Sequence, residues 1–357
     1  MTRKILFATA VLLASYAPAA LAQGALSLQG LGYPSGGISA RAEGAGSSLA
    51  DFDALSLTAP ASLAGVRSPA LFFQYSPEFR KVTTSSGSAS TTTARFPLVA
   101  GVLPMGQEWT LGLSSSTFLD RSTETDLERV QIVGAPTDTV TLVERNRVLG
   151  AINDVRLALA WANSPKFRIG VGAHVFTGSN RITFSQLFPD SSKYISTAQA
   201  GRISYAGFAA SLGLEFHPSR VIGFAVSGRK GGDLRAQSGD TAIGSATLPD
   251  HYSASVIYEG ISGASISARV AHDAWSSLGS LSSSGIQAFD GWDAGVGIEA
   301  SGPRIMQRII TVRVGGRFRT LPFGLNGQKV SETTFAGGLG IPLSRDRAAL
   351  DVAIQRA

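Results

Sequence analysis

Histidine, serine and acidic residues are the side chains of this chain that could carry out catalysis. His272 and Asp273 shortly precede Ser276 and Ser277, and these residue types are the parts of a serine hydrolase. A nucleophile, a base and an orienting carboxylate must converge in space, and one His-Asp pair in a serine-rich stretch does not establish this. The chain contains no GxSxG elbow and no P-loop motif. We therefore expect that the protein is not an enzyme.

Metal and cofactor binding are also weakly supported. The absence of cysteine excludes disulfides, thiolate metal sites and a cysteine nucleophile. The four histidines, at positions 174, 217, 251 and 272, have no HExxH or similar metal-binding spacing. Asp120, Glu124, Asp126 and Glu128 have the mixed spacing that is typical of a solvated loop. We expect no bound metal and no cofactor.

Residues 1–22 have the features of a signal peptide. Arg3 and Lys4 precede an apolar run over residues 5–15, and Ala20-Leu21-Ala22 fits the small-x-small pattern before a cleavage site. The run is too short to span about 30 Å of hydrocarbon comfortably. We expect cleavage before residue 23 and export of the mature chain.

The composition indicates many short strands. The chain is 44% hydrophobic and 16% charged, it contains 41 glycines, and long helical periodicity is absent. After the signal segment, no stretch approaches the roughly 18 consecutive apolar residues of a membrane helix. The formal charge of +6 comes mostly from arginines that are scattered singly, without a basic run, so nucleic acid is not an expected partner. Charge inside a polar lumen, or contact with lipid phosphates, fits this distribution better.

Residues 309–320, IITVRVGGRFRT, show the alternation that this composition predicts. Ile310, Val312, Val314 and Phe318 share one parity, whereas the arginines of this stretch take the other. In a strand the two sets face opposite sides of the sheet. A soluble sandwich would bury the first set, and a barrel in a membrane would turn it toward lipid.

The connections between the strands distinguish these two architectures. Short turns alternate with long polar connections, as in an outer-membrane barrel, and a soluble sandwich has no reason for this order. Every backbone group must be paired in lipid, so the sheet must close. The thirteen expected strands are 68–80, 92–103, 108–118, 148–162, 167–183, 199–216, 221–231, 249–260, 263–275, 286–300, 306–319, 333–342 and 348–356.

The sequence thus predicts an all-β protein, a transmembrane antiparallel β-barrel in the outer membrane of a Gram-negative-type bacterium. Such barrels usually have an even number of strands, so about fourteen are expected, with the last one missing from this chain. The alternation assigns Arg156, Arg168, His174, Arg269, Arg313 and Arg317 to the lumen. A polar pore and a soluble secreted β-sandwich remain as alternatives.

Residues 40–50, ARAEGAGSSLA, resemble the start of mature FadL-type proteins, the long-chain fatty acid transporters of the outer membrane. In that family a similar run precedes an Asn-Pro-Ala motif, where this chain reads TAPA at residues 58–61. Residues 101–104 (GVLP) and 109–114 (WTLGLS) are similar to the family's second and third strands. The PorV-type secretion barrels are a sister group with the same N-terminal sequence pattern.

The resemblance implies a fourteen-stranded barrel over residues 68–357, with residues 23–67 folded inside it as a plug. It also implies that hydrophobic molecules bind near the outer loops and leave sideways beside a kinked third strand, here residues 108–118. The lateral gate would contain Gly112, Ser114, Ser115 and Ser116, because glycine and serine interrupt the apolar pattern there. The candidate ligand-binding residues are Tyr33, Phe52, Leu55, Trp109, Leu111 and Leu113.

We expect on this basis a channel that passes hydrophobic small molecules, such as long-chain fatty acids, into the periplasm. Its partners would be the lipid bilayer, lipopolysaccharide and the hydrophobic ligand. The alternative is a PorV-like barrel that holds a partner protein through the loop at residues 119–147 without transport.

Overall fold

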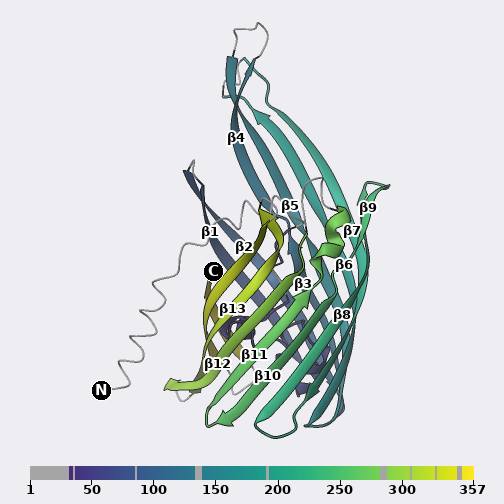
Figure 1. Ribbon diagram of the computed structural model, residues 1–357, viewed down its shortest axis with the longest axis vertical. Coiled ribbons are helices and arrows are strands. Elements are labelled where there is room, and N and C mark those ends of the chain that lie inside the picture. The colour runs from purple at the N-terminus through teal and green to yellow at the C-terminus, as the bar shows by residue number, and fades with distance from the viewer. Residues whose placement is uncertain are drawn as a thin grey trace, which may run out of the picture.

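The computed structural model describes residues 32–34, 37–84, 87–132, 139–189, 193–281, 288–305, 308–325, 328–343 and 348–357 (Figure 1). The expected signal peptide lies outside these residues. The strands are β1 (Ala70–Thr84), β2 (Gly87–Met105), β3 (Trp109–Asp120), β4 (Thr123–Ile132), β5 (Thr139–Ser164), β6 (Phe167–Leu187), β7 (Thr197–Phe216), β8 (Ile222–Ser238), β9 (Thr241–Thr247), β10 (His251–Ile261), β11 (Ala264–Asp273), β12 (Gly291–Ile305), β13 (Arg308–Leu325), β14 (Gln328–Leu343) and β15 (Ala348–Arg356). Within the described ranges, three short helices accompany them: α3 (Ala40–Gly44), η1 (Pro60–Gly65) and η2 (Trp275–Leu281).

All strands belong to one antiparallel sheet that curves around an interior (Figure 1). Each wall strand pairs with the next wall strand along the chain, from β1 to β15. Only β4, which pairs with β5, and β9, which pairs with β8, lie off this path. The remaining thirteen strands correspond to the thirteen expected from the sequence, and the predicted fold class is confirmed.

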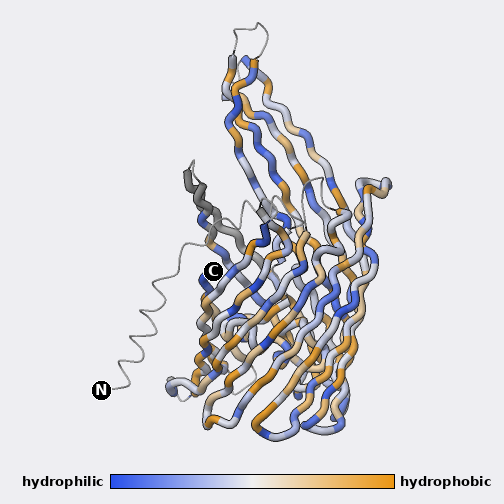
Figure 2. The backbone as a smooth tube through the Cα atoms, in the orientation of Figure 1, coloured by the Kyte–Doolittle hydropathy of each residue, from blue (hydrophilic) through white to orange (hydrophobic). Residues whose placement is uncertain are grey.

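Hydrophobic and hydrophilic residues alternate along the wall strands (Figure 2), and the two faces of the sheet differ in polarity as this alternation predicts. On β13, Val314 and Phe318 are 60% and 47% exposed on the outer face, whereas Arg313 is only 5% exposed on the inner face. Other exposed outer residues include Leu157, Val171, Leu212, Val226 and Val296. Leaving one such side chain in water costs about 1.5–3 kcal/mol relative to burying it, so this face requires an apolar surrounding. Among the described residues, no helix is long and apolar enough to cross a membrane.

Several connections expected to be loops are strands. The largest correction concerns residues 119–147, where β3 runs on to Asp120, β4 spans Thr123–Ile132 and β5 begins at Thr139. The strands β4–β7 therefore rise beyond the rest of the wall (Figure 1). Most of β4 is exposed on both faces, so water, rather than lipid, surrounds this extension and no alternation of polarity is needed.

Residues 37–66 form an inner segment that lies against the inner face of the sheet. Its η1 packs on β3, β5, β6 and β7, and its α3 packs on β13, β14 and β15, across the interior. These residues belong to the stretch expected to form the plug. Glycines in the wall permit a close approach: a Cβ at Gly295, Gly297 or Gly315 would overlap the backbone of Ala45 or Gly46.

Ion pairs and hydrogen bonds also join the inner segment to the wall. Arg41 donates to both carboxylate oxygens of Glu299, at 3.0 and 2.9 Å. Asp51 accepts hydrogen bonds from the hydroxyl of Ser255 at 2.5 Å and from Nε of Arg269 at 3.1 Å. Burial raises the pKa of Asp51, but the Arg269 guanidinium and the hydrogen bond from Ser255, together with smaller contributions from His251 and Ser253, outweigh it and hold that pKa below its usual range.

Candidate ligand path inside the sheet

An apolar cluster lies inside the sheet at the long-loop end of the wall. Its buried members come from β3 and β5–β9, from the segment between β9 and β10, and from η2: Phe118, Leu119, Ile152, Phe176, Tyr205, Leu234, Ala236, Ala246, Leu248, Trp275 and Leu278. Phe118 is at its centre, because its ring is stacked on Trp275 with 5.2 Å between centroids and meets Phe176 edge-on at 4.8 Å. We call this group the apolar cluster.

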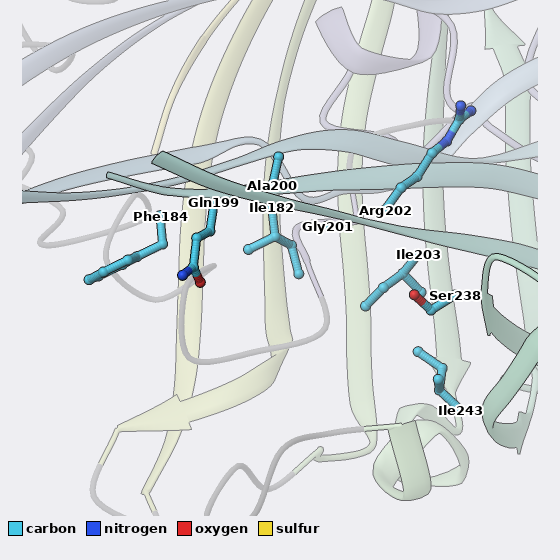
Figure 3. Close-up of a pocket in the computed structure, with 9 residues that line it drawn as sticks. All are labelled: Ile182, Phe184, Gln199, Ala200, Gly201, Arg202, Ile203, Ser238 and Ile243. Carbon is cyan, nitrogen blue, oxygen red and sulfur yellow. The ribbon is translucent and has the colours of Figure 1, made fainter. Parts of the chain in front are cut away.

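An outer pocket of about 480 Å³ is lined by residues of β6, β7, β8 and β9 (Figure 3). Ile203 belongs to its lining and also packs against the cluster, so the two regions are adjacent. The other lining residues are Ile182, Phe184, Gln199, Ala200, Gly201, Arg202, Ser238 and Ile243. Arg202 points away from Ile203 and Ile243 (Figure 3), and its guanidinium donates to the hydroxyl of Ser179. The pocket is therefore mainly apolar, with Gln199 and Ser238 as its polar groups.

A polar layer lies on the other side of the apolar cluster, toward the inner segment. His174 contacts the Asp154 carboxylate through Nδ1 and the Ser211 hydroxyl through Nε2. The Arg229 guanidinium lies 5.2 Å over the ring of Phe118 and 5.5 Å over that of Phe176, so it caps the cluster from this side. Arg156 donates to the carbonyl of Leu57, 3.0 Å away, and thereby contacts the inner segment.

The residues expected to be ligand-binding do not form one group. Tyr33 is buried beside β13 and β14, where its hydroxyl meets Glu332 at 3.0 Å and also contacts Arg319; burial raises its pKa to about 12. Phe52 lies edge-on to His217, next to the short turn after β7. Leu55 is half-buried in the inner segment.

The three expected ligand residues on β3 belong to its outer face. Trp109 packs against Trp161, with 6.4 Å between ring centroids, and also lines a smaller pocket of about 320 Å³ at the short-turn end. Leu113 is 58% exposed, and Leu111 shares its face. These side chains are positioned to contact lipid, or a molecule outside the wall, rather than a molecule in the lumen.

The residues expected to form a lateral gate lie in an unbroken part of β3. Residues 109–116 pair continuously with both β2 and β5, and the irregularity in this strand occurs between Thr117 and Leu119. Gly112, Ser114 and Ser116 face inward and Ser115 faces outward. The side chain of Leu63, from η1, covers Gly112, because a Cβ there would lie 2.8 Å from Leu63 Cδ1. The inner segment thus covers this strand from inside.

The structure places the residues assigned to the lumen on the inner face. Arg156, His174, Arg269 and Arg313 are buried there, and Arg168 and Arg317 are partly buried. Arg168 pairs with Glu215, and Arg317 with Asp293. The inner charges are thus largely compensated by partners on neighbouring strands.

Two groups of residues in the sequence could have carried out chemistry: the His, Asp and Ser residues at 272–277 and the acidic residues at 120–128. In the structure the members of each group contact other partners. His272 stacks edge-on to Trp292, whereas Asp273 pairs with His251, so the four residues near position 275 form no hydrolase site. Glu124 and Asp126 pair with arginines of β5 on the extension. Within the described residues, no group of three or more His, Cys, Asp or Glu side chains is arranged to hold a metal ion.

Sequence reasoning missed the apolar cluster. The available signal was Phe176, which has the same parity as the inward-facing Arg168 and His174 and is therefore an apolar residue on a polar face. Trp275 and Leu248 lie next to strand ends, where aromatic and aliphatic residues are also common in interfacial girdles. Only the three-dimensional arrangement shows that they converge inside.

This architecture is similar to that of several solved structures. A FadL homologue from Pseudomonas aeruginosa matches with a TM-score of 0.60 at 12% identity, over 91% of this chain and 90% of that chain. The toluene transporter TodX of P. putida matches with a TM-score of 0.56 at 13% identity, over 90% and 92% of the two chains. The monoaromatic hydrocarbon channel CymD matches with a TM-score of 0.55 at 13% identity, over 89% and 92%.

No family model matches the chain, and no curated protein matches it. At these identities the likeness concerns the fold, and it extends over about nine-tenths of each chain. The chain therefore has the fold of the FadL-type barrels, as the resemblance of its N-terminal residues implied.

Proposed function

We propose that this protein is an outer-membrane channel that passes hydrophobic small molecules toward the periplasm. The observation that carries the proposal is an apolar pocket that continues into the apolar cluster inside a wall whose outer face is also apolar. Two structural neighbours, TodX and CymD, are named for toluene transport and for monoaromatic hydrocarbons, which supports the same class of ligand. On this proposal the outer face contacts lipid and the extension emerges among lipopolysaccharide.

The route would begin at the outer pocket and continue through the apolar cluster. Burying each methylene group of a ligand there contributes about 0.8 kcal/mol, so a longer chain is captured more strongly. A long-chain fatty acid fits the order of the groups, with its chain in the cluster and its carboxylate near Arg229. The inner segment would act as a plug, because η1 and Leu63 block the way toward the short-turn end.

Uptake of a labelled long-chain fatty acid, in cells that lack their own outer-membrane fatty acid transporter, tests this proposal. Ile203→Glu places a carboxylate in the outer pocket, whereas Ser204→Glu places one on the opposite face of the same strand, away from the pocket lining. We expect uptake with the natural chain and with Ser204→Glu, and a strong loss with Ile203→Glu. Heat-modifiable gel mobility would verify that each barrel has folded.

Equal uptake by both glutamate variants would contradict the route through the outer pocket. Uptake of toluene but not of fatty acid would retain the channel and replace the ligand class. No uptake of either compound by a folded, inserted barrel would refute the channel.

Docking of a partner protein remains the second candidate function, and the extension provides the observation that favours it. Leu127, Val130 and Ile132 of β4 are 56%, 70% and 60% exposed, on a part of the sheet that is wetted on both faces. If these residues bind a partner protein, capture of that protein would depend on residues 119–147 and would occur without ligand flux.

A further inference from the structure

Three neighbouring wall strands place a serine, a histidine and an aspartate in hydrogen-bonding contact. Nδ1 of His174 on β6 lies 2.9 and 3.0 Å from the two carboxylate oxygens of Asp154 on β5. Nε2 of the same ring lies 2.9 Å from Oγ of Ser211 on β7. Because the carboxylate accepts the Nδ1 proton, Nε2 is left to accept the proton of the serine hydroxyl. This is the order of nucleophile, base and orienting carboxylate that activates a serine.

Strand register produces this contact. His174 pairs with Arg156 on one side and with Ala209 on the other, so its ring reaches Asp154 and Ser211 diagonally, two residues away on each neighbouring strand. All three side chains are at least 90% buried on the inner face. The ring is held between two partners and cannot turn without losing both hydrogen bonds.

Gly172 lets the backbone of β6 lie close to the serine oxygen. A Cβ at this position would lie 2.5 Å from Ser211 Oγ, 3.5 Å from His174 Nε2 and 3.6 Å from Arg156 Cδ. A side chain at this position would displace the Ser211 hydroxyl, so glycine is needed to keep the serine in contact with His174.

Two guanidinium groups supply donors for the negative charge that develops on a carbonyl oxygen. Within the described residues, Nε of Arg156 and Nε of Arg229 are both buried without a hydrogen-bond partner. Arg156 is opposite His174 in register, and Arg229 is opposite Ser211. Preorganised donors at the developing oxyanion contribute strongly to acyl transfer.

We infer that Ser211, His174 and Asp154 form a serine-hydrolase centre for esters with an apolar acyl chain. The apolar cluster would hold that chain, since His174 is stacked 6.2 Å from Phe176 and Arg229 lies over both Phe118 and Phe176. Substrate access rests on the proposed function, because the ester would enter by the same hydrophobic route.

The reaction needs only the ester and water. Ser211 Oγ attacks the carbonyl carbon while its proton passes to His174 Nε2. The tetrahedral intermediate collapses, the C–O bond to the alcohol breaks, and the alcohol leaves with that proton. Water then attacks the acyl-enzyme with His174 as base, which restores the serine hydroxyl and releases the acid as a carboxylate beside the arginines.

A fluorophosphonate probe and p-nitrophenyl butyrate, applied to the purified folded barrel in detergent, test the inference. We expect covalent labelling at Ser211 and ester turnover, both of which are lost in Ser211→Ala. Ser253→Ala is the matched control, because Ser253 is also buried and inward-facing but has the Ser227 hydroxyl, 2.7 Å away, as its partner. This variant should keep labelling and turnover.

Asp154 acts through His174 and is a positioning residue. Asp154→Asn should lower kcat by roughly 10³- to 10⁴-fold, as expected when the histidine is held in the wrong tautomer, and should leave KM unchanged. A rise in KM at unchanged kcat would show that Asp154 shapes the binding site only.

Absence of labelling in the natural folded barrel, or equal labelling of Ser211→Ala, would overturn the hydrolase. These assays in detergent require no transport across a membrane, so they are independent of the uptake experiment. Ester turnover without uptake would support the hydrolase and refute the channel. Uptake without labelling of Ser211 would support the channel and refute the hydrolase.

Discussion

The buried contact between Asp51 and Arg269 is predicted to hold the inner segment in place. Both side chains are at most 5% exposed, and Asp51 also accepts a hydrogen bond from Ser255. Removing one partner of a buried ion pair costs roughly 3–5 kcal/mol because the other charge stays buried. In Asp51→Ala, Arg269 keeps Asp293 at 3.5 Å, so we expect the lower end of this range.

A single introduced cysteine can measure this change, because the natural chain contains none. Ala50 is fully buried in the inner segment, so a cysteine in Ala50→Cys reacts with maleimide only when the segment leaves the wall. A loss of about 3 kcal/mol would raise the labelling rate roughly a hundredfold, since each 1.4 kcal/mol corresponds to a factor of ten.

Two further variants make the result specific. Asp126→Ala removes an exposed ion pair with Arg145 on the extension and should leave labelling unchanged, because water and salt screen such a pair and it lies far from the inner segment. Arg269→Met combined with Asp51→Leu should restore slow labelling, because no unpaired charge remains. An increase below about threefold in Asp51→Ala would refute the anchoring role, since it corresponds to less than about 0.7 kcal/mol.

Three other predictions concern the same segment. Gly297→Val should prevent the inner segment from packing against the wall, because a Cβ at position 297 meets the backbone of that segment. Gly337→Val should be tolerated, because a Cβ at position 337 meets nothing closer than 3.9 Å. Maleimide labelling of Ala50→Cys and gel mobility would show the difference. Burial raises the pKa of Glu43 to about 7 from its usual 4.5, so the stability that its protonated carboxyl gives to the docked inner segment is complete below pH 4.5 and is lost as pH rises through 7. The maleimide labelling rate of Ala50→Cys, divided by the rate in Ala50→Cys with Glu43→Gln, should therefore increase between pH 5 and 8. A constant ratio would contradict this prediction. Phe52→Asp combined with Leu55→Asp should abolish uptake while the barrel remains folded, and unchanged uptake would remove the plug role of the inner segment.

The wall could be predicted from the sequence because lipid imposes alternation. Residues 309–320 show it most clearly, with valine and phenylalanine outside and arginine inside. The extension could not be predicted in the same way, because β4 carries Leu127 and Val130 on opposite faces and water surrounds both. A strand without a buried face leaves no periodic signal.

The contacts inside the sheet could not be predicted from the sequence for a different reason. Asp154, His174 and Ser211 are separated by 20 and 37 residues, and each alone is an ordinary inward-facing polar residue. Parity assigns a residue to a face, but register decides which residues meet, and a shift by one residue turns a side chain to the other face. The short turn between β5 and β6 fixes the register of Asp154 against His174, whereas β6 and β7, which carry His174 and Ser211, are joined at the less predictable long-loop end.

The position of the inner segment also has a consequence for assembly. Tyr33, which precedes the inner segment, contacts Glu332, and Arg41 of the inner segment contacts Glu299, so these contacts with the wall close loops of 299 and 258 residues. Structures dominated by such distant contacts fold slowly, because the entropy of loop closure is lost before the contacts form. The backbone of Ala45 and Gly46 lies directly on wall glycines from β12 and β13, which leaves no room for a late threading step. The inner segment must therefore pack against the first strands before the last strands pair and enclose it. Substitutions in this segment should delay insertion of the whole barrel.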